Sequence, residues 1–342
     1  MAILGVLAVH IGSAVKELPE ILRQLLDRGQ LGVQLFFVVS AFTLCQSADW
    51  SGGPTHFRAA GFFIRRIFRI APAYWLAAVA YFVIAMFTKS PPPDAVSRLF
   101  ASLLFLNYLQ PGWVMSDFPP GGWSIVAEVF FYLSFPFLYA QIRTARHALL
   151  GLMLSVGAST LLSRLMLTLD HSTTGVFASV AVSATSYFGI VAQLPVFLCG
   201  FLAIRMNPHA FSWRGSSFLI AVVIVLSCLT KSIPTALALP YFGLLFAAFL
   251  KSLSNDPPAL FVNAPLIRIG EISFSMYLVH FAIIDLIISL WPAPLSGLSN
   301  LVLLSSATIA TTVLVSHATH RYIEKPFIAL GRRLAGPTTV NS

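Results

Sequence analysis

The chain consists of apolar runs of 13 to 20 residues that follow one another with short polar connections. A helix needs about 20 mostly apolar residues to cross the hydrocarbon core of a bilayer. Charged residues make up 10% of the chain, whereas soluble proteins carry about 25%. So few charges cannot cover a soluble surface. The sequence therefore predicts an all-α fold, a polytopic integral membrane bundle of about ten transmembrane helices. The predicted spans are 3–15, 31–47, 70–88, 123–140, 148–167, 186–204, 216–230, 234–250, 271–290 and 299–318.

The distribution of the basic residues predicts how these spans are oriented across the membrane. Cytoplasmic loops of membrane proteins carry an excess of Lys and Arg, and this rule is best satisfied with both termini in the cytoplasm. The apolar stretch 98–110 is too short to span, and we predict one re-entrant or interfacial helix there. Counting it as a span would move Arg143 and Arg146 to the outer side. The basic residues assigned to the inside are Arg58, Arg65, Arg66, Arg69, Arg143, Arg146, Arg205, Arg214, Lys251, Arg268, Arg321, Lys325, Arg332 and Arg333.

The domain organisation is simple. We predict a single transmembrane domain over 1–335 and a short disordered tail at 336–342. The first span begins at Met1 and reaches Lys16 after about 13 apolar residues, so we expect the true first helix to begin upstream. A signal peptide is not expected, because a basic n-region is missing.

Several partners are disfavoured. The net charge is +9, but no basic tract is interleaved with aromatic residues, so no nucleic acid is expected. The three cysteines lie in separate apolar runs, which is typical of buried, inert thiols. The spacing of His317, His320 and Glu324 could hold a metal, but no second ligand helix accompanies them. We therefore expect no metal.

Ionisable side chains inside predicted spans are candidates for function, because burying them in lipid is costly. His10 follows seven apolar residues and is either a hydrogen-bonded core histidine or a general base. Glu128 lies four residues after Ser124, so both point from one helix face. They either cap the helix or face a polar cavity. Tyr277 and His280 belong to a polar stripe that must face protein or water.

A dense basic cluster lies at one predicted membrane edge. Arg66 and Arg69 are three residues apart and Arg65 and Arg69 four apart, so the three share one helix face. Tyr74 follows directly after Ala73 in the same motif. The cluster is either a topology anchor or a phosphate-binding site, since forked guanidinium groups suit phosphate oxygens.

Taken together, these motifs resemble the membrane-bound acyltransferase 3 family, the bacterial enzymes that acylate cell-surface sugars. The resemblance covers almost the whole chain, and the order and spacing of the motifs make it specific. The segments that carry it are His10, GVQLFFVVSAF at 32–42, RRIFRIAPAYW at 65–75, GGWSIVAEVFFYLSFP at 121–136, SFSMYLVHF at 273–281 and RYIEKPF at 321–327.

The resemblance assigns roles to individual residues. It implies that His10 is the essential histidine of the first helix, acting as general base. Arg66 and Arg69, with Arg65 beside them, would hold the phosphates of an acyl-coenzyme A donor. Glu128 would orient His10 or bind acceptor hydroxyls. The residues expected to contact substrate are Ser40, Tyr74, Trp123, Ser124, Tyr277 and His280.

Two departures from the family pattern stand out. The acidic residue and the arginine that usually precede the first-span histidine fall before Met1, which puts activity of the chain as given in doubt. The usual S-G-F after the second span is Ser40-Ala41-Phe42 here, a minor change. If an acyl-enzyme forms, Ser40 and Ser124 are its candidate nucleophiles.

The expected function is acyl transfer, acetyl by default, from cytoplasmic acyl-CoA to a hydroxyl of a cell-surface or exported glycan or a lipid-linked sugar, in the bacterial inner membrane. Two alternatives stay open. A multi-span transporter or flippase also uses intramembrane His and Glu as a proton relay. A catalytically inactive family relative would keep the motifs without the chemistry.

Overall fold

The computed structural model describes residues 1–50, 58–88, 91–115, 117–172, 187–207, 212–230, 235–291 and 296–336. These residues fold into helices and connecting loops, with no strand among them, which confirms the all-α class. The helices are α1 Ala2–Ala14, α2 Glu20–Asp27, α3 Leu31–Trp50, α4 Ala59–Thr88, α5 Ala95–Leu103, α6 Trp123–Gln141, α7 Ala145–Ser172, α9 Ile190–Arg205, α10 Trp213–Thr230, α11 Thr235–Asn255, α12 Ala264–Glu271, α13 Ser273–Ser289, α14 Gly297–Thr319 and α15 Lys325–Ala335.

Each of the ten predicted spans overlaps one of these helices, but their number as membrane crossings stays a prediction. By length and composition, five described helical segments can cross a bilayer, or six if α12 and α13 form one broken span. α1, α9 and the described apolar part of α10 are shorter than a full crossing. The five segments are Glu20–Trp50, Ala59–Thr88, Trp123–Gln141, Ala145–Met166 and Gly297–Ala335.

The segment predicted as re-entrant or interfacial folds as α5 and two 3-10 turns, Asn107–Leu109 and Pro111–Trp113. Arg98 donates to Asp94 over 2.8 Å and to Asp117 over 3.1 Å, and the Trp113 indole donates to Asp94 over 2.7 Å. The hydrogen bond from Arg98, followed by that from Trp113, lowers the pKa of the Asp94 carboxyl. The loop is therefore folded by its own polar contacts. The predicted tail lies outside the described residues from 337 onward.

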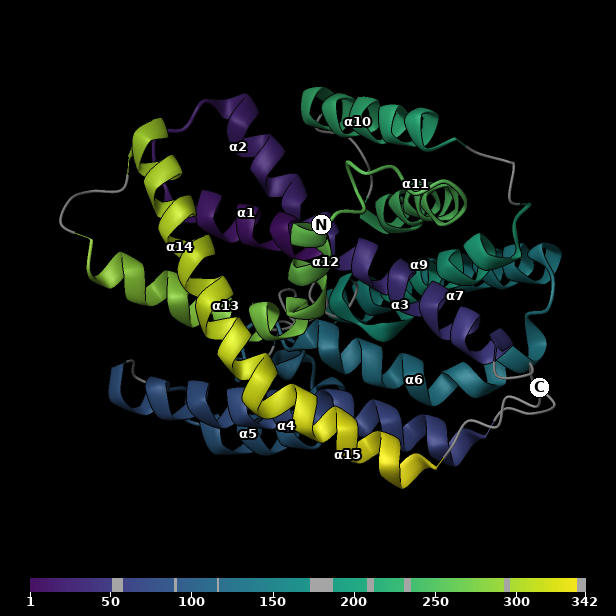
Figure 1. Ribbon diagram of the computed structural model, residues 1–342, viewed down its shortest axis with the longest axis horizontal. Coiled ribbons are helices and arrows are strands. Elements are labelled where there is room, and N and C mark those ends of the chain that lie inside the picture. The colour runs from purple at the N-terminus through teal and green to yellow at the C-terminus, as the bar shows by residue number, and fades with distance from the viewer. Residues whose placement is uncertain are drawn as a thin grey trace.

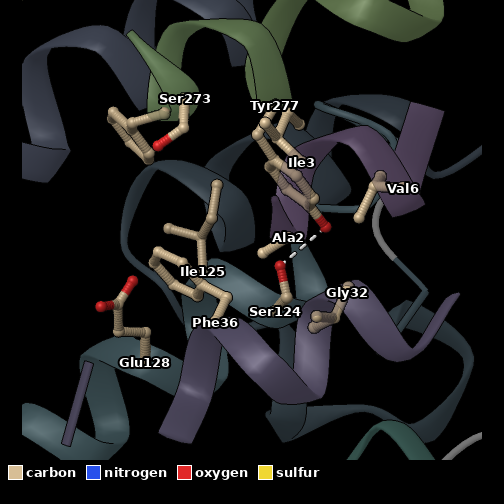
Figure 2. Close-up of a pocket in the computed structure, with 12 residues that line it drawn as sticks. Ala2, Ile3, Val6, Gly32, Phe36, Ser124, Ile125, Glu128, Ser273 and Tyr277 are labelled. Atoms are coloured by element: carbon tan, nitrogen blue, oxygen red, sulfur yellow. Dashed lines mark hydrogen bonds between the residues drawn. The ribbon is translucent and has the colours of Figure 1, made fainter. Parts of the chain in front are cut away.

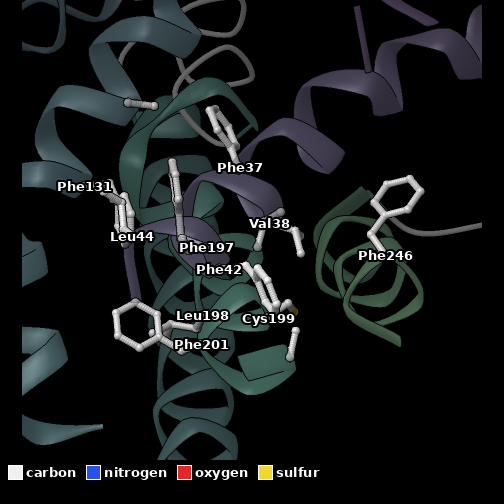
Figure 3. Close-up of a cluster of buried hydrophobic side chains, with 14 of the residues drawn as sticks. Phe37, Val38, Phe42, Leu44, Phe131, Phe197, Leu198, Cys199, Phe201 and Phe246 are labelled. Atoms are coloured by element: carbon white, nitrogen blue, oxygen red, sulfur yellow. The ribbon is translucent and has the colours of Figure 1, made fainter. Parts of the chain in front are cut away.

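The larger hydrophobic core is formed by α3, α6, α9 and α11. Its centre is a stack of three rings (Figure 3), with Phe197 centred 4.4 Å from Phe37 and 4.0 Å from Phe131. Of the predicted inert thiols, Cys45 and Cys199 are buried and free, and the side chain of Cys228 lies outside the described residues. A second core joins α1, α13 and α14.

The C-terminal helices tie the two cores together. In Figure 1, α14 and α15 form one long rod that crosses α13 and then runs along α4. The rod is continuous because a π-helical turn, His320–Glu324, joins the two helices. Glu324 is buried in this turn, where it accepts hydrogen bonds from Ser275 of α13 and from His320, the latter over 3.0 Å. In the described residues no group of three or more possible metal ligands is formed.

These contacts fix the start of α13, which bends away from α12 by 73°. Ser275 lies in the first turn of α13 and is fully buried. A buried carboxylate needs hydrogen-bond donors for both oxygens, and Ser275 and His320 supply one each. The C-terminal motif is therefore joined to the helix that carries Tyr277 and His280.

The tightest packing between α3 and α9 depends on Gly200. A Cβ atom at this position would lie 2.5 Å from the Val38 carbonyl oxygen and 2.6 Å from the Ala41 Cβ. Gly157 of α7 is its opposite, because a Cβ there would meet nothing within 4 Å. The two glycines therefore form a matched pair for measuring how closely the helices pack.

Replacing Gly200 with alanine should lower the free energy of unfolding by about 1–3 kcal/mol, the usual cost of overpacking a core. Gly157→Ala is the control and should be neutral or slightly stabilising, because alanine favours a helix over glycine. The measurement is the midpoint of thermal unfolding in detergent. A Gly200→Ala variant as stable as the parent would contradict the close approach of α3 and α9.

Candidate active site

Two adjoining cavities lie where α1, α3, α6 and α13 meet. The larger, here called the arginine cavity, measures about 560 Å³ and is also bounded by α4 and α11. The smaller, called the inner cavity, measures about 60 Å³, and the residues that line it are drawn in Figure 2. The residues common to both cavities are Ala2, Ile3, Phe36, Glu128, Ser273 and Phe274.

Glu128 is the polar group at the junction of the two cavities. It is only 3% exposed. Its Oε1 accepts a hydrogen bond from Ser40 of α3 over 2.7 Å and a short one from Tyr132, one turn further along α6. Donors from two helices therefore hold one oxygen of the carboxylate, and the side chain lines both cavities.

Arg66 and Arg69 of α4 line the arginine cavity. The Arg66 guanidinium lies 5.7 Å from the centres of the Phe62 and Tyr132 rings, so its position is fixed by aromatic faces. Among the described residues neither arginine forms an ion pair with a carboxylate. The cavity therefore contains two positive charges that no carboxylate in the described part of the chain neutralises by direct contact. Arg65 is half-buried and does not line the cavity.

Ser124 and Tyr277 close the opposite end of the inner cavity. Their hydroxyl groups are hydrogen-bonded over 2.7 Å (Figure 2), and the Tyr277 hydroxyl donates to the Gly121 carbonyl over 2.8 Å. The N-cap of α6 is Gly122, and no side chain caps this helix. Of the two roles open to Ser124 and Glu128, facing a cavity is therefore the one observed.

His10 and His280 form a pair on α1 and α13. Their ring centres are 5.3 Å apart, and the Phe281 ring lies 4.3 Å from His10 and 4.2 Å from His280. The Nδ1 of His280 lies 2.7 Å from the Tyr277 carbonyl oxygen. A carbonyl only accepts, so Nδ1 carries the hydrogen and a neutral ring has its lone pair on Nε2. That Nε2 is buried and has no partner among the described residues.

The structure brings most of the predicted site residues to these cavities but not all. Ser40, Glu128, Arg66 and Arg69 line the arginine cavity, and Ser124 and Tyr277 line the inner one. Neither His10 nor His280 lines a cavity. His280 lies one turn beyond Tyr277 on α13.

Two predicted aromatic residues lie away from the cavities. Tyr74 is fully buried, with its ring stacked 4.9 Å from Phe105. Trp123 packs its ring against Phe37 at 6.2 Å and Phe188 at 4.7 Å. Both contribute to packing around the site and line neither cavity.

Sequence reasoning missed Tyr132 and the apolar walls. Tyr132 completes a stripe with Ser124 and Glu128 at intervals of four, and this spacing was a signal that could have found it. Phe36 and Ile125 line the inner cavity, but they lie in runs that are apolar on every side, so nothing in the sequence sets them apart.

The chain was compared with known proteins. It is 25% identical to the acyltransferase MdmB of Streptomyces mycarofaciens, over 97% of this chain and 90% of the relative. A Staphylococcus aureus (strain COL) protein that carries an O-acetyltransferase name is 24% identical, over 96% of this chain and 56% of its own length. The chain thus spans little more than half of that relative. No solved structure matches.

A protein of Acidianus two-tailed virus that carries an acetyltransferase name is also similar, with 25% identity over 76% of this chain and 74% of its own. The family model for the acyltransferase domain of type 3 matches residues 1–317. With most of its length inside that match, the chain belongs to the acyltransferase 3 family, and its activity is that of a transferase.

Proposed function

We propose that the protein is a membrane-embedded O-acyltransferase that moves an acyl group from acyl-CoA to a hydroxyl of a cell-surface or exported glycan or a lipid-linked sugar. The observation that carries the proposal is the position of Glu128. It lines both the cavity that contains Arg66 and Arg69 and the cavity that ends at Ser124 and Tyr277. A donor bound in the first cavity would present its thioester beside the second.

Charge and size support acyl-CoA as the donor. Guanidinium groups bind phosphate through paired, charge-assisted hydrogen bonds, and Arg66 and Arg69 are not engaged by carboxylates of the described residues. The arginine cavity has about 560 Å³, within the range of small-molecule sites. Acyl-CoA offers the phosphates that fit the arginines and a slender arm that fits the cavity.

The proposed reaction forms one ester bond and breaks one thioester bond. The acceptor oxygen attacks the thioester carbonyl, the carbon–sulfur bond breaks, and the proton lost by the hydroxyl ends on the coenzyme A thiolate. His10 acts as the general base, in keeping with a neutral imidazole near physiological pH. His280 positions it through the contact between the two rings.

Two roles are expected for Glu128, orienting His10 or binding an acceptor hydroxyl, and the second is the one proposed. Its hydrogen bonds in the described part of the chain come from Ser40 and Tyr132, and neither of these residues connects it to His10. On this proposal it binds an acceptor hydroxyl at the junction of the cavities. No metal is needed for any step.

The proposed location is the bacterial inner membrane, with both termini and the arginine cavity facing the cytoplasm. The positive-inside distribution of Lys and Arg supports this orientation. Membership of an acyltransferase family favours an enzyme over the transporter or flippase alternative. An inactive relative is distinguished from an active enzyme by the assays below.

Replacing His10 with alanine should lower acyl transfer by about 10²–10⁴-fold, the usual contribution of a general base. Coenzyme A binding should be unchanged, because the histidine pair lines neither cavity. The measurement is transfer of radiolabel from acetyl-CoA to glycan in membrane vesicles. His147→Ala, on an exposed position of α7, is the control. Full transfer by His10→Ala would refute the assigned base.

Replacing Arg66 or Arg69 with alanine should weaken coenzyme A binding by about tenfold or more. A hydrogen bond to a charged group contributes about 1.5–3 kcal/mol, and about 1.4 kcal/mol is a tenfold change in affinity. Titration calorimetry with the purified protein measures the change. Arg146→Ala, exposed at the start of α7, should bind like the parent. Equal coenzyme A affinity in all three variants would show that the donor does not bind in this cavity.

A further inference from the structure

The hydroxyl group of Tyr81 joins α4 to the backbone of α13. It donates a hydrogen bond to the Leu278 carbonyl over 3.0 Å and accepts one from the Ala282 amide over 2.9 Å. In an α-helix each amide bonds to the carbonyl four residues earlier, so these two groups are partners in one turn of α13. The tyrosine therefore contacts both ends of a single backbone hydrogen bond of another helix.

The contact depends on the phenol oxygen. A tyrosine hydroxyl is both a donor and an acceptor, and Tyr81 uses the two capacities on two backbone groups. Side chains that insert into the hydrogen-bond ladder of a helix change its local direction. Because α13 stays helical from Ser273 to Ser289, the hydroxyl fixes the position of the turn without ending the helix.

The turn that this hydroxyl contacts carries the part of α13 that faces His10. His280 and Phe281 both belong to it, and their ring centres lie 5.3 Å and 4.3 Å from that of His10. The His280 Nδ1 lies 2.7 Å from the carbonyl oxygen of Tyr277, just before the turn. A shift of the turn would therefore move both rings relative to His10.

The same tyrosine belongs to the helix that carries the arginines of the larger cavity. Tyr81 lies about 18 Å beyond Arg69 along the axis of α4, at about 1.5 Å per residue. Arg66 and Arg69 line the arginine cavity, and Tyr81 lines neither cavity. One helix therefore places the two positive charges and also holds the turn that carries His280.

We infer that Tyr81 is a positioning residue for acyl transfer, which holds the His10–His280 pair in place relative to the arginines of α4. It acts through the backbone of α13 and does not touch the donor. The inference rests on the proposed function, since it requires a reaction at His10. The two hydrogen bonds from one hydroxyl to the turn of His280 carry it.

Replacing Tyr81 with phenylalanine removes one oxygen atom and keeps the ring. The kcat of acyl transfer should fall by about 10-fold to 100-fold, because a misplacement of about 1 Å can cost a factor of this size. The KM for acetyl-CoA and the affinity for coenzyme A should be unchanged. The measurements are transfer of radiolabel in membrane vesicles that contain the full chain, and calorimetry with the purified protein.

Tyr139→Phe is the matched control. The Tyr139 side chain is fully buried near the opposite end of α6 from Ser124, and its hydroxyl donates to Asp49 over 2.6 Å. A hydrogen bond to a charged group contributes more than one between neutral groups. Tyr139→Phe should therefore lower the midpoint of thermal unfolding at least as much as Tyr81→Phe, yet leave kcat unchanged.

A double variant tests whether Tyr81 acts through His280. Adding Tyr81→Phe to His280→Ala should lower kcat by less than about twofold, because the effects of two residues that act through one contact do not add. A general loss of stability would instead lower kcat by the same factor in both backgrounds.

The outcomes separate this role from the proposed function. A parent protein that transfers no acyl group and binds no coenzyme A would overturn both. With an active parent, a Tyr81→Phe variant of unchanged kcat would overturn the positioning role alone. The same holds for a loss of coenzyme A affinity in this variant, for an equal loss of kcat in Tyr139→Phe, and for a full further loss in the double variant.

Discussion

A carboxylate buried in an apolar bundle is the constraint on which the site depends. Glu128 is almost fully enclosed, and a charge in such surroundings is stable only with hydrogen-bond donors around it. Ser40 of α3 and Tyr132 of α6 provide them. These donors hold α3 and α6 in register beside α4, whose Arg66 stacks on the same Tyr132 ring. The polar site and the packing of three helices therefore depend on one another.

The second half of the site is held by a different set of contacts. α13 carries Tyr277 and His280, and its first turn is tied to the C-terminal rod by the hydrogen bond between Ser275 and Glu324. The π turn makes this possible, because it places Glu324 on the buried side of a helix that otherwise continues into α15. The RYIEKPF motif at 321–327, to which Glu324 belongs, thus positions the helix that faces α1, on which His10 lies.

How much of the fold and the site could be predicted from the sequence depends on the physics of apolar helices. Uncharged runs locate the helices, and a spacing of four places Ser124 and Glu128 on one face. Which helix faces which was not predictable, because residues that are apolar on every side leave no stripe to mark the buried face. The bond between Ser124 and Tyr277 joins positions 153 residues apart. The aromatic residues Tyr74 and Trp123 share motifs with site residues, yet their rings pack into the core, a distinction only the fold makes.

On the proposed function, the two cavities also separate two unlike chemistries within so apolar a protein. Phosphate binding needs exposed positive charge, and Arg69 is exposed. Acyl transfer is favoured where little water reaches the thioester, and most of the residues that line the inner cavity are apolar. A single cavity would have to satisfy both needs with the same walls. Glu128 lies where the charged region on α4 adjoins the region between α1, α3, α6 and α13. On the proposed function, a donor would span both regions, with its phosphates in the first and its acyl group in the second.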